Sequence, residues 1–345
     1  MLDQEVRKWQ TVLQKIIQSP KERQRLASAL GINVITLTRW AKENSNPQRS
    51  YLTRLVQVVQ PQQRAELLIA LLDAYPDMQE KLLAEASEVV PSAFFRQLLK
   101  DRASVVESMQ FWQISTAVLD EALRLLDPHH LGLAVTPVLC MPPIEGKIRS
   151  LREHGGRGTF PWVSDLSHLS TFLGMNSLAG HVVQNGRAAS VRDIEHEQII
   201  PAFSYPENLE KSSAAAPIWL EGKIAGCLLA SSAQLDYFTQ SRMDLLDTLA
   251  SIYSLALNPG DFYDLDQVHL RYMPHPDVQQ IHLQSYRERV ARLMTDADEA
   301  GQPLSCAQAE MCAWREIEDI LLCIGQETKK SSLAEIGVTN PQANE

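Results

Sequence analysis

The segment 33–42 combines side-chain types that proteins use to contact double-stranded DNA. In an α-helix, a rotation of about 100° per residue brings positions 35, 38, 39 and 42 to one face. The guanidinium of Arg39 could bind the O6/N7 edge of a guanine, and Val34 or Ile35 could contact a thymine methyl group. The whole candidate set for DNA contact is Asn33, Val34, Ile35, Thr38, Arg39, Lys42, Arg49 and Arg54.

The distribution of charge favours nucleic-acid binding by the first sixty residues. Residues 1–60 hold ten Lys or Arg and four acidic residues, a net charge of +6, whereas the whole chain carries −10 and the remainder therefore about −16. DNA repels an acidic surface, so we expect contact in the basic part alone. Lys42, Arg49 and Arg54 are expected to contact phosphates. A solvated helix face would explain Lys42 and Arg54 equally well.

Two short helices separated by a glycine are predicted around this segment. The first runs from about Glu22 to Leu30 and ends at Gly31, because glycine adopts the left-handed conformation without a steric cost. Asn33 is a suitable cap for the second helix. The inward faces are expected to carry Leu26, Ala27 and Leu30 on the first helix and Leu37, Trp40 and Ala41 on the second.

The spacing of Ala27, Gly31, Leu37 and Trp40, followed by the proline-containing loop and helix of NSNPQRSYLTRLVQVV (44–59), resembles the Cro/repressor type of helix-turn-helix. This resemblance implies that the second helix lies in the major groove with its N-terminal residues at base edges. One such unit binds weakly, so a homodimer on a two-fold site is expected. An ordinary helical hairpin is the alternative.

Residues 126–258 change to β-rich patterns. Two of the runs are joined by Glu221-Gly222, a turn-forming pair that predicts a hairpin. The order of helices and strands favours an antiparallel α+β sensor fold over a βαβ unit. The glycines within 155–158 do not complete GxGxxG, and GxxxxGK[ST] does not occur, so phosphate-loop chemistry is not expected. The β-rich runs are 131–141, 188–193 and 214–232.

Three pieces of this region, in order, resemble the GAF domain. They are SLAGHVVQNGRAASVRD (177–193), the hairpin SSAAAPIWLEGKIAGCLLAS (212–231) with Pro217 entering and Gly222 turning, and a closing helix. The resemblance spans 108–258. It implies a small-molecule or regulatory pocket on one face of the sheet and dimerisation through flanking helices, without identifying the ligand. The apolar residues matched in the closing helix are Phe238, Leu245, Leu246, Leu249 and Ala250.

The implied pocket is expected between the central strands and the segment 160–193. Trp162 and Phe172 could stack on a planar ligand, and Arg192 could pair with an anionic group. Core packing is the alternative for both aromatic residues, and a hydrogen-bonded helix position for His181. The candidate ligand-binding set is Trp162, Phe172, His181, Arg192, Ser213 and Cys227.

The cysteines and histidines offer little for catalysis or metal binding. Neither Cys140 nor Cys227 has the flanking motif expected for bilin attachment, and a buried thiol behaves as a small hydrophobic group. The five cysteines form no CxxC pair, and no histidine has metal-ligand spacing with them. We therefore expect no metal site and no enzyme activity, and the cofactor stays unknown.

Residues 259–325 return to amphipathic helical patterns, which must pack on the body or on a partner. One helix is predicted at about 277–296, and a second opens with the capping box of Ser305 and Gln308 and ends near Cys323. A flexible tail is expected at 326–345. The predicted segments are a helix-turn-helix at 1–60, a helical linker at 61–107, a GAF-like domain at 108–258, a helical region at 259–325 and the tail.

Together these patterns predict an α+β protein: a cytoplasmic, homodimeric, DNA-binding transcription regulator that senses a small molecule or partner. The first twenty residues do not resemble a secretory signal, and no run of 18 apolar residues predicts a membrane span. Two alternatives remain. One is a GAF-type enzyme or tetrapyrrole photoreceptor tethered to DNA, and the other is a GAF interaction module without a ligand.

Overall fold

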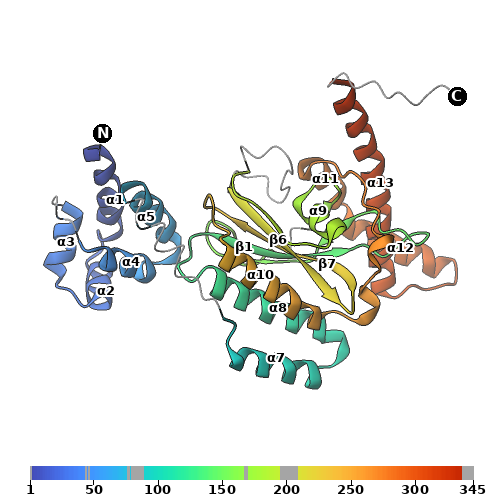
Figure 1. Ribbon diagram of the computed structural model, residues 1–345, viewed down its shortest axis with the longest axis horizontal. Helices are drawn as coiled ribbons and strands as arrows, with labels where there is room; N and C mark the ends of the chain where they lie inside the picture. The colour runs from blue at the N-terminus through green and yellow to red at the C-terminus, as the bar shows by residue number, and fades with distance from the viewer. Residues whose placement is uncertain are drawn as a thin grey trace.

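The computed structural model describes residues 2–42, 45, 47–75, 78, 89–166, 170–194 and 209–335. Figure 1 shows N-terminal helices on one side, a central sheet covered by helices, and C-terminal helices on the far side. The helices before the sheet are α1 (Leu2–Ile16), α2 (Pro20–Leu30), α3 (Val34–Lys42), α4 (Arg49–Val58), α5 (Pro61–Ala74), α7 (Ser92–Ser104) and α8 (Glu107–Leu126).

Helices α2 and α3 and the turn between them lie where the sequence predicts them. Gly31 caps α2 in the left-handed conformation, with φ of 68°. The Asn33 side chain accepts a hydrogen bond from the backbone N–H of Ile35 at 2.9 Å, which satisfies a free donor at the start of α3. All six residues expected on the inward faces are buried: Leu26, Ala27, Leu30, Leu37, Trp40 and Ala41.

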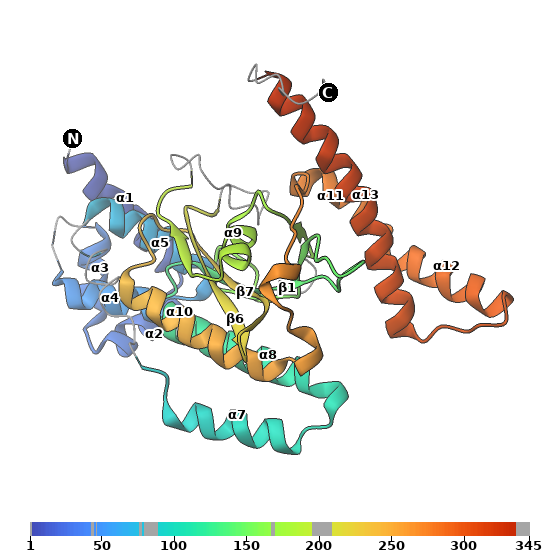
Figure 2. The ribbon, with the colours of Figure 1, turned by 45° about the vertical axis from the view of Figure 1, so that its right-hand side comes forward.

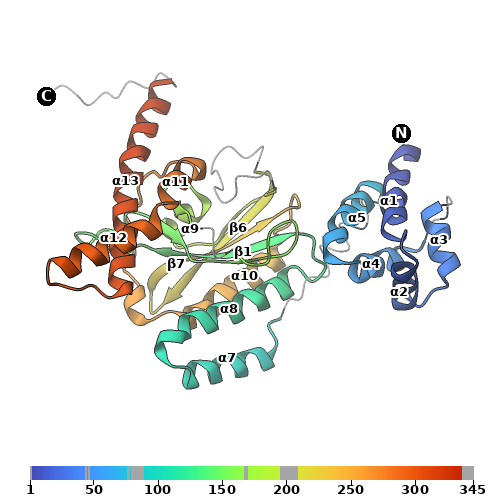
Figure 3. The same cartoon turned by 180° about the vertical axis from the view of Figure 1, so that it is seen from behind.

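Helix α5 belongs to the N-terminal helices, although the sequence placed residues 61–107 in a linker. Leu67, Leu68 and Leu71 of α5 are buried in the same apolar cluster as Trp9 of α1. Figure 1 shows α5 alongside α1. The apolar stripe of α5 covers α1, so the N-terminal group of packed helices extends past residue 60, where the sequence analysis places the end of the helix-turn-helix segment. Helix α7 packs instead against α8 through its buried Leu98, below the sheet domain in Figure 3.

The sheet has seven strands in the order β4-β2-β1-β7-β6-β5, with β3 paired to β1, and its strand pairs are antiparallel. The antiparallel α+β class is therefore confirmed. The elements of this domain are β1 (Leu133–Cys140), β2 (Leu151–Glu153), β3 (Arg157–Gly158), β4 (Phe172–Leu173), α9 (Leu178–Asn185), β5 (Ala189–Val191), β6 (Ser212–Leu220), β7 (Lys223–Ser232) and α10 (Gln240–Tyr253).

The predicted hairpin is formed by β6 and β7. Glu221 and Gly222 both have positive φ, 52° and 78°, as a two-residue hairpin turn of the I′ type requires. Pro217 differs from expectation, because it lies inside β6 opposite Cys227 rather than at the entry to the strand. Strand β5 pairs only with residues 213–215, so the missing N–H of Pro217 removes no bond between β5 and β6.

Side chains alternate between the two faces of the sheet. Helices α8 and α10 cover one face, where Leu133 and Val135 of β1 are buried, and α9 covers the other, where Val138 and Cys227 are buried. Figure 2 shows α8 and α10 side by side beneath the strands and α9 above them. This alternation explains the β-rich patterns, because both faces of the central strands are covered.

The C-terminal helices are α11 (Pro276–Leu283), α12 (Tyr286–Glu299) and α13 (Cys306–Glu335). The single helix predicted at 277–296 is broken at Gln284–Ser285, where the Ser285 hydroxyl donates to the carbonyl of His282 at 2.8 Å. The predicted capping box is confirmed: the Ser305 N–H donates to the Gln308 side chain at 2.9 Å, and the Gln308 N–H to the Ser305 hydroxyl at 3.3 Å.

Helix α13 continues beyond its predicted end near Cys323. Residues 326–335 are helical, so the tail expected from 326 does not begin there, and residues 336–345 lie outside the described part. The apolar stripe of Ile317 and Leu321 is buried as the sequence predicts. Among the described helices, none is long and apolar enough to cross a bilayer.

Candidate functional site

The central members of the candidate DNA-contacting set lie on the outer side of α3. Ile35, Arg39 and Lys42 are exposed, Ile35 with 68% of its surface, while Leu37 and Trp40 on the other side of the helix are buried. An isoleucine this exposed packs little against the described part of the chain. The helix therefore presents a mixed apolar and basic surface to its surroundings.

The other candidate residues of α3 and its cap, Asn33, Val34 and Thr38, make hydrogen bonds within the helix. Thr38 and Val34 are half-buried, and the Thr38 hydroxyl donates to the Val34 carbonyl at 2.8 Å. Asn33 is exposed at the tip, with its side-chain oxygen engaged in the cap. Its amide nitrogen can still donate to an outside partner.

The two predicted phosphate contacts beyond α3 make contacts within the chain. The Arg49 guanidinium lies 3.6 Å from the centre of the Tyr75 ring, which ties α4 to the end of α5. Arg54 donates to the carbonyl of Ala29 at 3.4 Å and is exposed. Arg49 therefore has a packing role that the sequence did not indicate.

The six candidate ligand-binding residues do not gather around one cavity. Trp162 is buried with Ala134 and Leu166, and Phe172 is buried against Trp314 of α13 with ring centroids 5.9 Å apart. Both aromatic residues therefore pack in the core, which is the alternative that their sequence pattern left open.

His181 and Arg192 lie on the surface. The His181 ring and carbonyl contact the Asn185 amide one turn later in α9, with the amide 2.9 Å from the carbonyl. The Arg192 side chain is 79% exposed and 3.8 Å from the Asp236 carboxylate. Neither side chain faces the interior of the domain.

Ser213 and Cys227 lie on the sheet face that α9 covers, near two buried carboxyl groups. The Ser213 hydroxyl donates to Glu210 at 2.7 Å. Glu153 of β2 is 1% exposed; one of its oxygens accepts the N–H of Thr171 at 3.2 Å, and the other has no partner among the described residues. Burial raises the pKa of Glu153 to about 8 and that of Glu210 to about 7. Neither glutamate belongs to a motif that would mark it in the sequence.

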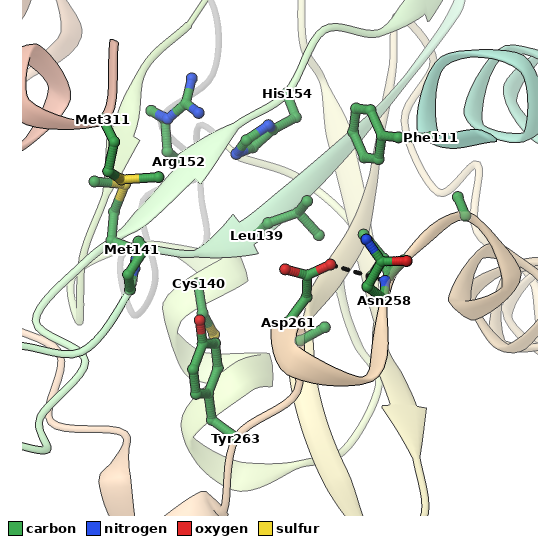
Figure 4. Close-up of a pocket in the computed structure, with 14 residues that line it drawn as sticks. Phe111, Leu139, Cys140, Met141, Arg152, His154, Asn258, Asp261, Tyr263 and Met311 are labelled. Carbon is green, nitrogen blue, oxygen red and sulfur yellow. Dashed lines mark hydrogen bonds between the residues drawn. The ribbon is translucent and has the colours of Figure 1, made fainter. Parts of the chain in front are cut away.

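A cavity of about 310 Å³ lies on the α8 face of the sheet. It is found at the N-terminal end of α8, where the sheet meets α13. Figure 4 shows Arg152 and Met311 on one side, Phe111 on the other and His154 between them. Its walls come from α8, from the ends of β1 and β2, from residues between 256 and 263, and from α13. None of the six candidate residues lines this cavity. Its lining residues come from segments far apart in the chain, so no local sequence pattern indicates them.

Arg152 is the positively charged side chain in the lining of this cavity. Leu151 and Glu153 point to the α9 face, so Arg152 between them points to the α8 face. Its guanidinium carbon lies 4.2 Å from the centre of the Trp314 ring, and its Nε is buried without a hydrogen-bond partner among the described residues. Burial lowers the pKa of Arg152 to about 10, which still leaves it charged at neutral pH.

The other polar side chains of the cavity are either neutral or already accept a hydrogen bond. Burial, assisted by the Arg152 charge, holds the pKa of His154 well below its usual value, so the imidazole is neutral. Asp261 accepts the N–H of Asn258 at 2.8 Å as part of a capping box. Burial raises the pKa of the Cys140 thiol to about 12, so it stays protonated. In the described part of the chain, no three His, Cys, Asp or Glu residues gather in a metal-binding arrangement.

The central part of the chain is similar to known proteins. A comparison with curated proteins finds no match for the chain. Among solved structures, it is similar to a type II free methionine-R-sulfoxide reductase from Thermoplasma acidophilum (13% identity, 46% of this chain and 97% of that one, TM-score 0.33). It is also similar to the GAF domain of an Acinetobacter phosphoenolpyruvate-protein phosphotransferase (16%, 52% and 92%, TM-score 0.33). The family described as GAF domain matches residues 111–258, so this part of the chain is a GAF domain, in general a ligand-sensing or interaction module.

Proposed function

We propose that the chain is a cytoplasmic, homodimeric transcription regulator that binds DNA through α3 and an effector through its GAF domain. The observation that carries the DNA-binding part is the outer face of α3, where Ile35, Arg39 and Lys42 are exposed together while the opposite face is buried. The net charge of +6 on residues 1–60 supports it, because phosphate binding requires a basic surface.

In this proposal α3 lies in the major groove. Arg39 binds a guanine edge, Ile35 and Val34 contact thymine methyl groups, and Asn33 lies at the N-terminal tip. Lys42 and Arg54 contact phosphates and fix the register. The Thr38 hydroxyl can donate to DNA only if it leaves the Val34 carbonyl, and Arg49 would contact a phosphate through N–H groups at the edge of the guanidinium that lies on Tyr75.

An Arg39→Ala variant is expected to bind its preferred duplex about 5- to 150-fold more weakly, since a bidentate arginine–guanine contact contributes about 1–3 kcal/mol. Fluorescence polarisation of a labelled duplex, selected from a random library with the full chain, measures this affinity. Lys42→Ala should weaken all duplexes alike and reduce the slope of log K against log salt by about one.

The matched control is Arg187→Ala, which removes an exposed arginine from the GAF domain and should leave DNA affinity unchanged. The proposal fails if library selection yields no duplex bound more tightly than random DNA. It also fails if Arg39→Ala binds the selected duplex as the parent chain does.

The state of the thiols favours a regulator over a GAF-type reductase. A nucleophilic cysteine must ionise near neutral pH, whereas burial raises the pKa of Cys140 to about 12 and that of Cys227 further still. Purified protein should therefore be inert toward thiol-dependent reduction of methionine sulfoxide, and turnover in that assay would count against a purely regulatory role. Native mass spectrometry tests the homodimer.

A further inference from the structure

We propose that the cavity in Figure 4 binds a small organic acid, with its carboxylate at Arg152 and His154 and its apolar end against Phe111 and Leu257. This inference rests on the proposed function, because it names the chemical class of the effector. It places the effector on the α8 face of the sheet, opposite the face that carries Ser213 and Cys227.

The first argument is the unmet hydrogen-bonding capacity of Arg152. A buried guanidinium is costly unless a carboxylate or hydrogen-bond acceptor compensates it. Among the described residues the Arg152 guanidinium lies over the face of Trp314, and its Nε has no acceptor. Glu310 is the carboxylate whose charge reaches it, but Glu310 is exposed on α13 and accepts a hydrogen bond from the Cys306 thiol at 3.5 Å. An anion inside the cavity would supply the missing acceptors.

The second argument is the balance of charge around the cavity. His154 is neutral there, and Asp261 already accepts the N–H of Asn258. The backbone N–H of His154 donates to the carbonyl of Pro137 at 2.9 Å, and its ring stands edge-on to Phe111 with the ring centroids 6.1 Å apart. The neutral imidazole carries one N–H that it can donate to a carboxylate oxygen beside Arg152. At its own end of the cavity Arg152 attracts an anion and repels a cation, while the Asp261 carboxylate lies beside Asn258.

The third argument is size and apolar lining. A volume of about 310 Å³ lies at the lower end of the range for small-molecule sites. A second cavity of about 210 Å³ shares Phe111, Arg152 and His154 with it and runs along α8 toward Leu119. Apolar walls with a few convergent polar groups fit an aromatic or medium-chain carboxylic acid better than a sugar or a nucleotide.

Isothermal titration of the full chain, without DNA, tests the inference with phenylacetate and octanoate against their uncharged amides, phenylacetamide and octanamide. We expect each carboxylate to bind at least ten-fold more tightly than its amide. Arg152→Gln should remove this preference, and Arg152→Lys should keep part of it, because the lysine retains the charge but not the bidentate geometry.

The matched control is Arg187→Gln, which removes an exposed arginine between α9 and β5 and should leave the preference unchanged. A second readout needs no variant at Arg152: binding should change the emission of Trp314, and this change should be absent from Trp314→Phe. Circular dichroism and thermal unfolding identify any Arg152 variant that fails to fold. If one fails, the change in Trp314 emission on ligand binding replaces that variant as the test.

Three results would overturn the inference: equal affinity for acids and amides, a preference that survives in folded Arg152→Gln, or tighter binding of phenethylamine that depends on Asp261. The DNA assay with Arg39→Ala is separate from this titration. Carboxylate binding without selective DNA binding would therefore reject the regulator proposal and keep the cavity, whereas the reverse would reject the cavity alone.

Discussion

At pH 9 a Glu153→Gln variant is expected to be more stable than the parent chain, by up to about 5 kcal/mol in the free energy of unfolding. The fold raises the pKa of Glu153 from 4.5 to about 8, chiefly because burial disfavours the ionised carboxylate. The folded state therefore holds the proton more tightly than the unfolded state does. This contribution is fully present below pH 4.5 and is lost as the pH rises toward 8.

Denaturant unfolding between pH 5 and pH 9 measures the effect. The parent chain should lose stability across this range, and Glu153→Gln should lose much less, with the remaining slope supplied by Glu210 and Asp127, whose pKa values are about 7 and about 6. Glu221→Gln, which changes an exposed glutamate in the β6–β7 turn, is the control and should follow the parent curve. Parallel curves for parent and Glu153→Gln would show that Glu153 is not protonated in the fold.

An Asp127→Ala variant is expected to lose about 3 kcal/mol or more of stability at pH 7. The Asp127 carboxylate, 1% exposed at the end of α8, accepts the N–H groups of Leu131 at 2.6 Å and Gly132 at 3.3 Å, together with the hydroxyl of Thr159 at 2.5 Å. Removing it leaves two buried backbone donors without acceptors, and each costs about 1–3 kcal/mol.

Urea unfolding followed by tryptophan emission measures this loss. Asp296→Ala, which removes an exposed aspartate from α12, is the control and should stay within about 0.5 kcal/mol of the parent. Burial raises the pKa of Asp127 to about 6, so the deficit of Asp127→Ala should grow as the pH falls from 6 toward 4, where the parent carboxyl takes up its proton in the fold. Equal stability of Asp127→Ala and Asp296→Ala would contradict this role.

The elements with local sequence signals were predictable. Gly31 and Asn33 end one helix and begin the next through their own backbone and side-chain chemistry, so no distant residue was needed to find them. The same holds for Glu221-Gly222, where two positive φ angles require a turn. The capping box of Ser305 and Gln308 is equally local.

The candidate ligand site was not predictable in the same way. The cavity is assembled from residues as far apart as Phe111, Arg152 and Met311, and no spacing along the chain indicates that α13 reaches β2. Trp162 and Phe172 were correctly identified as large and apolar, but their type does not distinguish a ligand wall from a packed core. The role of α5 was missed because its stripe of leucines is equally compatible with a linker that packs elsewhere.

Helix α8 joins two places that have so far been treated separately. Its first turns carry Phe111 into the cavity, and its last residue precedes Asp127 and His129, whose ring lies 3.4 Å from the Gln57 amide of α4. Twenty helical residues span about 30 Å without a glycine or proline that would absorb a displacement. A helix of this length that tilts at its N-terminal end also shifts at its C-terminal end. A ligand in the cavity that tilts α8 would therefore displace the region around His129 that contacts α4.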